Sequence, residues 1–509
     1  MKVIIVGAGI GGLSTYLAFK KHISPLDPSL QIKILESHSS PRSQTLASGG
    51  GLGLAPNGLR SIASITTNAI SHIQARGFAG TSMTFRNDKG GMLGVMAVGR
   101  RERYGYDMMM MTRAGVHDAL LSEIEDESVI RWGVKVIGVE EINEGEGGVL
   151  VELADGTIEK ADLLVGADGV RSIVKDYLFK GEYQAQYDGL TGLGGFLPLS
   201  SIPTSLRESL PDHPVTMIFG RLGFLAYSVA SPLSDPDPLF MWWSIYETDS
   251  LPDRTNIDYE DVKRQLLHRS GSWKSPYDAT PRSQNDATKG IYRQLIELGC
   301  VPPSDAPLIP TNSNSSGPAS SKSMSTAPRI LPRYVTPRLP YWSNATAAAG
   351  TTSASKNRGR IFLLGDAAHT MPPDVGQGVS CAAEDAVVYA LLLKHYISNA
   401  AAASPTTLAV STTTSIKATA TDVNSPTSVL EQTAIAYESI RKPNINKLLD
   451  LAKRSGDMKK ELSWFGQVFR DLMMKLVLAF KLPETFNDVV FAYDPEEEVR
   501  KYITKASGR

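Results

Sequence analysis

Three glycines near the N-terminus have the spacing of a phosphate-binding turn. Gly7, Gly9 and Gly12 follow a short apolar run, residues 3–6, and residues 13–20 are typical of a helix. In such a turn the first glycine permits a tight bend, the second lets the backbone approach a pyrophosphate, and the third lets the helix pack closely on the strand. The amides that open the helix favour the same anion. The sequence therefore predicts a dinucleotide site here, and an ordinary glycine-rich turn is the alternative.

An acidic residue, Glu36, ends the next apolar run, residues 31–35. A carboxylate at this place can accept hydrogen bonds from ribose hydroxyls. Strand, glycine turn, helix, strand and acid together make a βαβ unit. Because a carboxylate disfavours a phosphorylated ribose, we expect FAD or NAD at this site rather than NADP.

A second acidic motif lies far along the chain, where Asp366 follows the apolar run of residues 360–364. A carboxylate at a strand end can bind a polyol, and the ribityl chain of a flavin is a polyol. The loop after it contains Gly376 and Gly378 and leads into residues 380–396, which are typical of a helix. The amides and dipole of that helix would stabilise negative charge on a reduced flavin. This motif therefore favours FAD.

A third motif lies between these two, where Asp168 follows a buried strand predicted over residues 162–166. Taken alone, an Asp-Gly turn is common, and an ordinary turn is the better interpretation. Its position between two cofactor motifs favours a place in the same site.

Together and in this order, the three motifs resemble the FAD-dependent monooxygenases of the aromatic hydroxylase type, the single-component class that is similar to para-hydroxybenzoate hydroxylase. The resemblance covers most of the chain and includes four further segments: residues 49–57, 111–120, 339–342 and 437–443. Residues 343–357 interrupt the family pattern before the strand that leads to Asp366, which points to a fungal or other eukaryotic origin.

The resemblance implies roles for particular residues. Glu36 would hold the adenosine ribose and Asp366 the ribityl chain, while Asp168 would lie near the pyrophosphate and assist the approach of the reductant. The family has no second Rossmann domain for NADPH or NADH, in agreement with the one glycine motif found here. The expected FAD-site residues are Gly7, Gly9, Gly12, Glu36, Gly51, Arg113, Asp168, Asp366, Gly376, Gly378 and Val379.

The same resemblance implies an activity. We expect an FAD-dependent monooxygenase that uses NAD(P)H and O2 to hydroxylate, or less favourably to epoxidise, a small aromatic or polyketide-like substrate of secondary metabolism through a flavin C4a-hydroperoxide. Tyr227 is the expected catalytic residue. Residues 187–195 lack an arginine that many relatives have, so the protein acid or base stays open. For His369 a structural hydrogen-bonding role is favoured over that of a base.

Two other functions remain as alternatives. One is a flavin-dependent halogenase, because residues 241–245 partly resemble the halogenase tryptophan motif, although the two tryptophans are adjacent and no proline follows. The other is a non-catalytic FAD-binding protein with a redox or interaction role.

Composition narrows the class of partner and the compartment. The 509 residues carry 52 Lys and Arg against 53 Asp and Glu, so there is no basic excess for nucleic acid. The only cysteines are Cys300 and Cys381, which is typical of a reducing, cytoplasmic location. No stretch is long and apolar enough for a transmembrane segment, and no His and Cys spacing indicates a metal site.

The predicted fold is α/β: a Rossmann-like FAD-binding domain of the GR2 type, an inserted and mainly antiparallel β substrate domain, and a C-terminal helical region. The Ser-, Thr- and Ala-rich tracts cannot bury enough apolar surface to order themselves. The predicted boundaries are residues 1–180 with 358–397 for the FAD-binding domain, 181–342 for the substrate domain with a low-complexity loop at about 305–327, 343–357 and 398–428 for low-complexity insertions, and 429–509 for the helices.

Overall fold

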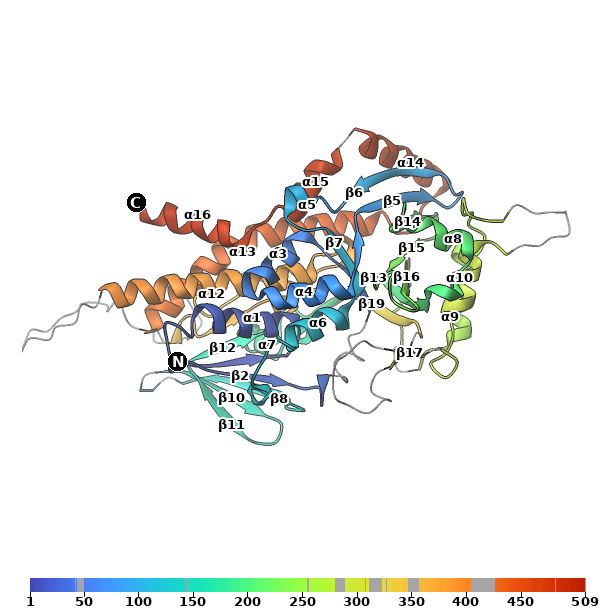
Figure 1. Cartoon of the computed structure of the whole chain (residues 1–509). Coiled ribbons are helices and arrows are strands. Elements are labelled where there is room, and N and C mark those ends of the chain that lie inside the picture. The colour runs from blue at the N-terminus through green and yellow to red at the C-terminus, as the bar shows by residue number, and fades with distance from the viewer. Residues whose placement is uncertain are drawn as a thin grey trace, which may run out of the picture.

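The structure is a computed structural model that describes most of the chain (Figure 1). Most of each predicted low-complexity tract lies outside the described residues. The residues not described are 42, 44–49, 143, 146, 254–255, 280–288, 307, 311–322, 326, 347–356, 404–425, 481 and 509.

A five-stranded parallel sheet forms the cofactor half of the molecule. Its strands run in the order β20-β12-β1-β2-β8, and every neighbouring pair is parallel. Because these strands are buried on both faces, they are short apolar runs, as the sequence predicts. Their bounds are β1 Lys2–Val6, β2 Gln31–Glu36, β8 Ile130–Trp132, β12 Leu163–Gly166 and β20 Ile361–Leu363.

The parallel arrangement explains how distant motifs meet. Gly7, Glu36, Asp168 and Asp366 each lie at or just after the carboxyl end of a strand, and these ends share one edge of the sheet. Helices α1 (Ile10–His22) and α12 (Gly378–Ala403) begin at that edge and pack against each other (Figure 1). A three-stranded antiparallel sheet, β9 (Val136–Glu141), β10 (Val149–Leu153) and β11 (Ile158–Ala161), adjoins this half.

A seven-stranded sheet forms the other half, in the order β19-β13-β16-β15-β14-β5-β6. All of its pairs are antiparallel except β14 with β5, which confirms a mainly antiparallel second unit. The bounds are β5 Ser82–Asn87, β6 Met92–Ala97, β13 Gln186–Pro198, β14 Val215–Phe219, β15 Phe224–Val229, β16 Leu239–Glu247 and β19 Arg329–Val335.

The predicted boundary at residue 180 does not separate the two sheets. Strands β5 and β6 come from the segment assigned to the FAD-binding domain, yet they extend the seven-stranded sheet. Sequence patterns missed this because the pairing of β5 with β14 joins residues far apart along the chain. The small sheet of β3 (Gly51–Leu54), β7 (Met108–Thr112) and β4 (Phe78–Gly80) comes from the same segment, with β5 and β6 between β4 and β7 along the chain.

The two faces of the seven-stranded sheet pack against different parts of the molecule. Helices α8 (Thr204–Ser209), α9 (Tyr259–Ser270) and α10 (Ile291–Gly299) cover the outer face and enclose a separate apolar core (Figure 1). The inner face looks toward the cofactor half.

The C-terminal helices hold the two halves together. Helices α13 (Pro426–Asp457) and α16 (Pro495–Ser507) pack on α12, α15 (Leu482–Phe491) contacts α3 (Pro56–Ile65), and α14 (Trp464–Ala479) packs on β6. Part of the predicted helical region therefore closes the substrate half.

Candidate functional site

A cavity of about 1550 Å³ extends from the edge of the parallel sheet to the inner face of the seven-stranded sheet. One end is lined by the cofactor motifs and the other by methionine and aromatic side chains. All of the predicted FAD-site residues except Gly12 line it: Gly7, Gly9, Glu36, Gly51, Arg113, Asp168, Asp366, Gly376, Gly378 and Val379.

The glycine turn has the geometry that a bound pyrophosphate requires. Gly7 has φ +102°, and a Cβ there would lie 2.5 Å from the carbonyl oxygen of Ala167. A Cβ on Gly12 would collide with the Gly7 carbonyl oxygen, whereas one on Gly9 would meet nothing within 4 Å. Gly9 is also the N-cap of α1, which has no side-chain cap and no acidic residue in its first turn. The turn therefore leaves space for an anion at a helix N-terminus.

Glu36 is held in place by the backbone at the end of β2. Its carboxylate accepts hydrogen bonds from the Ala8 amide at 2.8 Å and the His38 amide at 2.9 Å. The Nδ1 atom of His38 also lies 2.6 Å from Glu36 Oε1. Glu36 is buried yet still lines the cavity. This arrangement fixes a carboxylate where a ribose would reach it.

Asp366 and Arg113 both line the cavity and are close enough to interact electrostatically. Asp366 is exposed to it at the start of the short helix α11 (Asp366–His369), and Arg113 opens α6 (Arg113–Leu121). Burial lowers the pKa of Arg113, and the negative charge of Asp366 opposes that shift. The pair offers an acceptor for hydroxyls beside a donor for anionic or carbonyl oxygens.

Asp168 lies in the cavity wall and also supports the backbone. Its Oδ2 atom accepts hydrogen bonds from the amides of Ile173 at 2.8 Å and Val174 at 3.3 Å, at the start of α7 (Ile173–Phe179). Burial raises the pKa of Asp168, and these hydrogen bonds oppose the shift. Asp168 therefore holds the backbone at the start of α7, in addition to any contact that it makes with a ligand.

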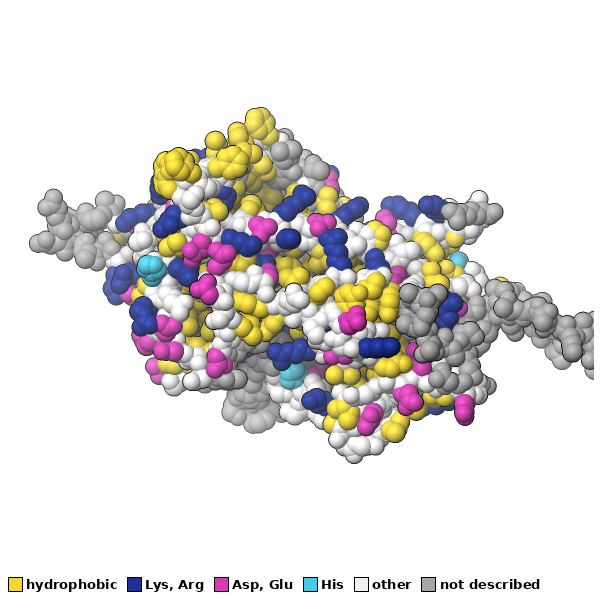
Figure 2. Space-filling view, turned by 180° about the vertical axis from the view of Figure 1, so that it is seen from behind, with side chains coloured by type: hydrophobic (Ala, Val, Ile, Leu, Met, Phe, Trp, Pro, Cys, Tyr) yellow, Lys and Arg dark blue, Asp and Glu magenta, His cyan; other side chains and the backbone are white. Residues whose placement is uncertain are grey.

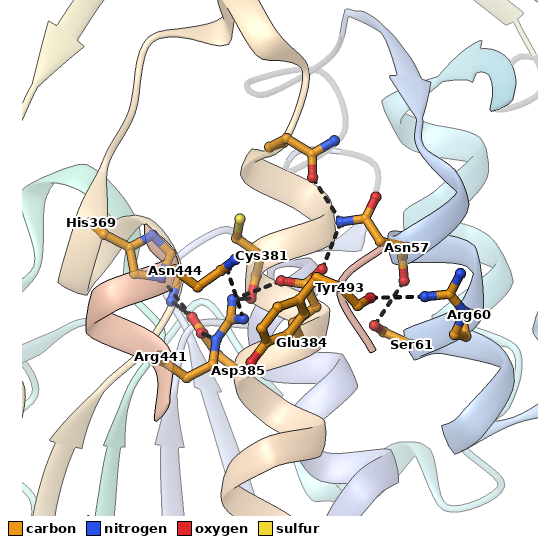
Figure 3. Close-up of polar contacts among 12 residues, drawn as sticks. Asn57, Arg60, Ser61, His369, Cys381, Glu384, Asp385, Arg441, Asn444 and Tyr493 are labelled. Atoms are coloured by element: carbon orange, nitrogen blue, oxygen red, sulfur yellow. Dashed lines mark hydrogen bonds and ion pairs between the residues drawn. The ribbon is translucent and has the colours of Figure 1, made fainter. Parts of the chain in front are cut away.

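A buried ionic network that sequence reasoning missed supports the loop before α12 (Figure 3). Asp385 accepts hydrogen bonds from the Gly365 amide at 2.9 Å and from Arg441 Nε at 2.7 Å, and it lies 2.7 Å from His369 Nε2. Burial alone would raise the pKa of Asp385, but His369 and Arg441 hold it below its ordinary value. The contact confirms the structural role expected for His369.

The other end of that loop is held by the same network. Asn57 on α3 donates to Gln377 at 2.7 Å and to Glu384 at 2.6 Å, and Glu384 forms an ion pair with Arg441 at 2.8 Å. Burial raises the pKa of Glu384 despite that partner. The network therefore fixes both ends of the loop, from Gly365 to Gln377, beneath the cavity.

The other end of the cavity is mainly apolar, and an ionic cluster joins it to the loop of residues 365–377. Asp374 pairs with Lys459 at 2.7 Å and with Arg333 at 2.9 Å, and Arg333 also pairs with Asp188 at 2.7 Å. Burial lowers the pKa of Lys459, and Asp374 opposes that shift. No sequence signal joined these residues because they come from separate parts of the chain. The apolar lining includes Met83, Phe85, Met217, Phe219, Met241, Trp243, Phe469 and Met473.

The structure does not bring Tyr227 to the cavity. Alternate residues of a strand face opposite sides of the sheet, and Tyr227 points to the outer core, where its ring stacks on Phe240 with centroids 5.6 Å apart. Burial raises its pKa well above the ordinary value. This placement argues against the expected catalytic role, since the side chain is not among the cavity-lining residues.

Comparison with known proteins supports FAD as the cofactor. A family model described as an FAD binding domain matches residues 326–414, which include Asp366 and the start of α12. The chain is 28% identical over 396 residues to an aurachin C monooxygenase/isomerase of Stigmatella aurantiaca, covering 77% of this chain and 80% of that protein. It is 24% identical to the FAD-dependent monooxygenase janM of Penicillium janthinellum, covering 77% and 67%.

A solved structure has a fold similar to that of this chain. The structure of Klebsiella pneumoniae HpxO complexed with FAD and uric acid superposes with a TM-score of 0.67 at 18% identity, covering 96% of both chains. Fold, cofactor motifs and relatives point the same way: the chain contains an FAD binding domain and is similar in sequence to FAD-dependent monooxygenases.

Proposed function

We propose that this enzyme uses FAD, NAD(P)H and O2 to hydroxylate a small, mainly apolar aromatic substrate bound beneath the seven-stranded sheet. One observation carries the proposal: a single cavity joins the cofactor motifs to a pocket lined by methionine and aromatic side chains. Epoxidation of a similar substrate is the less favoured outcome.

The residues present fit FAD along the length of the edge of the parallel sheet. We assign the pyrophosphate to the Gly7–Gly9 turn and the N-terminus of α1, the adenosine ribose to Glu36 and the ribityl chain to Asp366. The uncrowded Gly378 at the start of α12, where a Cβ would meet nothing within 4 Å, leaves space for the ring edge. When bound, FAD supplies the electron transfer and the activation of oxygen.

The task left to the protein is to orient the substrate and exclude water. The apolar lining does both, because it desolvates an aromatic ring and offers water few partners. We assign the polar contact with the substrate to Asp374 and its partner Lys459, which lie in the cavity wall in the same region as Gly376. A carboxylate held by two cations is suited to orient a hydroxyl or ring N–H.

The names of the compared proteins support the substrate class. One relative is an aurachin C monooxygenase/isomerase, and the HpxO structure contains uric acid, a heteroaromatic ring. The halogenase alternative is not favoured, because the compared relatives are monooxygenases. Trp242 also packs in the outer core, although both it and Trp243 are among the residues that line the cavity. Both cysteines are unpaired and buried, which fits the reducing, cytoplasmic compartment that we propose.

The experiment begins with the purified protein loaded with FAD. We expect a flavin spectrum and, among phenols and nitrogen heteroaromatics, compounds that stimulate NAD(P)H oxidation and are recovered with one added oxygen. Bound FAD without any substrate-stimulated oxidation would instead favour a non-catalytic flavoprotein. Chloride-dependent halogenation would favour the halogenase.

A matched pair of variants tests the FAD assignment. Asp366→Ala removes the proposed ribityl partner, and we expect FAD to bind at least about tenfold more weakly, since a hydrogen bond to a charged group contributes roughly 1.5–3 kcal/mol. Asp155→Ala removes an exposed carboxylate in the turn between β10 and β11 and serves as the control. Equal FAD retention in the two variants would contradict the role of Asp366.

A further inference from the structure

Helix α14 has the reverse of the polarity expected for a surface helix. Two of its polar side chains point into the protein: Gln467 donates to Asp88 at 2.7 Å, and Arg470 donates to the carbonyl oxygens of Phe219 at 3.1 Å and Gly220 at 3.0 Å. Its large apolar side chains face outward, with Phe465 exposed by 77%. Figure 2 shows hydrophobic side chains gathered at the top of the molecule, where Figure 1 places α14.

The apolar side chains of α14 form two faces. The outer face, which does not line the cavity, consists of Trp464, Phe465, Val468, Leu472, Leu476 and the following Phe480. The inner face lines the cavity with Phe469, Met473 and Val477, each still 40% exposed or more. So wide an apolar surface on a helix is normally covered by a neighbour. The outer face is exposed among the described residues, so its neighbour has to come from outside them.

The charges on α14 indicate what that neighbour is. Lys475 is the one charged residue of the helix that is exposed, and Asp471, its only carboxylate, is paired with Arg470 at 3.0 Å. The outer face therefore combines aromatic and aliphatic side chains with a cation. That combination suits the headgroup region of a lipid bilayer, where aromatic rings and lysines sit at the interface. A second copy on the same face would add a like charge instead.

The length of α14 fits a helix that lies along a membrane surface and does not cross the membrane. Its 16 residues span about 24 Å. Among the described residues, no helix has the length and apolar character needed to cross a membrane.

We propose that the outer face of α14 binds the surface of a lipid bilayer, with the helix axis parallel to the membrane. Because the inner face of the same helix walls the cavity, an apolar substrate dissolved in the bilayer would pass beside α14 into the pocket. This route for the substrate rests on the proposed function. The binding to lipid does not.

The test is co-sedimentation of the FAD-loaded full chain with vesicles of phosphatidylcholine, and of phosphatidylcholine mixed with phosphatidylserine. The test variant is Phe465→Ser/Leu472→Ser/Leu476→Ser on the outer face. The control replaces three exposed apolar residues elsewhere, Ile137→Ser/Ile158→Ser/Leu233→Ser. Retained FAD and an unchanged circular dichroism spectrum show that each variant is folded.

We expect the parent and the control to bind both kinds of vesicle, somewhat better with phosphatidylserine, and the α14 variant to partition at least about tenfold more weakly. Three results would overturn the proposal. One is absence of vesicle binding by the folded parent. Another is binding only to phosphatidylserine that salt removes and the α14 variant retains. The third is a dimer without lipid that the α14 variant alone dissociates, which would make a second copy the occupant. None of these readouts depends on activity.

Discussion

The two ends of the cavity are lined by different kinds of chemical group. Beside the parallel sheet the lining is backbone and charged side chains, with Gly9, Glu36 and Asp366 at strand ends on one edge of the sheet. Beneath the seven-stranded sheet the lining is mainly methionine and aromatic, and its charged side chains include the pair of Asp374 and Lys459. Hydrogen bonds and dipoles at the first end select one cofactor. Apolar contacts at the second end accept a range of substrates of suitable shape.

Substitutions at the two ends should therefore have different effects. Changes at the cofactor end should alter FAD affinity and, where the backbone or the buried network is involved, the stability of the fold. Changes at the apolar end should alter kcat/KM for the substrate while FAD remains bound. The predictions that follow test that division.

The largest effect is expected from Arg441→Met, in the network beneath the cofactor loop. The substitution leaves Glu384 and Asp385 buried without their cation, and breaking a buried pair in this way costs about 3–5 kcal/mol. Chemical denaturation should show that loss in the free energy of unfolding, together with weaker FAD binding.

Arg338→Met is the matched control for that experiment. Arg338 pairs with Asp450 on the surface, where both side chains are at least half exposed. An exposed pair contributes about 1 kcal/mol or less. If both variants lose the same stability, the network does not support the cofactor end as described.

Two glycine variants distinguish a glycine that the packing of the protein requires from one that leaves space for the ligand. Gly12→Ala places a Cβ against the Gly7 carbonyl oxygen and should destabilise the protein by about 2 kcal/mol or more, because backbone cannot move aside cheaply. Gly9→Ala meets no protein atom within 4 Å and should leave the melting temperature unchanged. FAD affinity should nevertheless fall about tenfold in Gly9→Ala, since its methyl group enters the space proposed for the pyrophosphate. Normal FAD affinity would show that the pyrophosphate lies elsewhere.

At the apolar end, Asp374→Asn should lower kcat/KM about tenfold and keep FAD bound. The substitution removes the charge that compensates Lys459 and Arg333 but keeps an amide oxygen that can accept a hydrogen bond, so it should cost about 1.5–3 kcal/mol of stability at neutral pH. Burial already lowers the pKa of Lys459, and losing Asp374 lowers it further.

The pH dependence of that variant follows from the sign of the shift. A lysine whose folded pKa is below its unfolded value binds fewer protons when folded, so stability rises with pH through that range. The stability gap between Asp374→Asn and the parent should therefore narrow at alkaline pH in urea unfolding. A gap that stays constant would mean that Lys459 does not feel the charge of Asp374.

The smallest effect is expected from Tyr227→Phe. Because Tyr227 packs in the outer core against Phe240, removal of its hydroxyl should change kcat by no more than about twofold and stability by about 1 kcal/mol or less. Steady-state kinetics on an identified substrate checks this. A large loss of kcat with unchanged stability would restore the catalytic role that the sequence suggested.

Much of the cofactor end could be predicted because its signals are local. Gly7, Gly9 and Gly12 are close in sequence, and each acidic residue follows an apolar strand. A parallel sheet then places all strand ends on one edge, so separate motifs become one site. The supporting network could not be predicted in this way, since Asn57, Asp385 and Arg441 come from distant segments and meet only through the packing of α3, α12 and α13.

The residue types and their order along the chain were enough to identify a flavin site and its class of enzyme. Tertiary structure alone decided which side of each strand faces the cavity, so Trp243 reaches it and Tyr227 does not. It also carried β5 and β6 into the second sheet and brought Lys459 to Asp374. The physical reason is that backbone turns and strand ends are set by near neighbours, whereas an apolar pocket and its buried ion pairs depend on long-range packing.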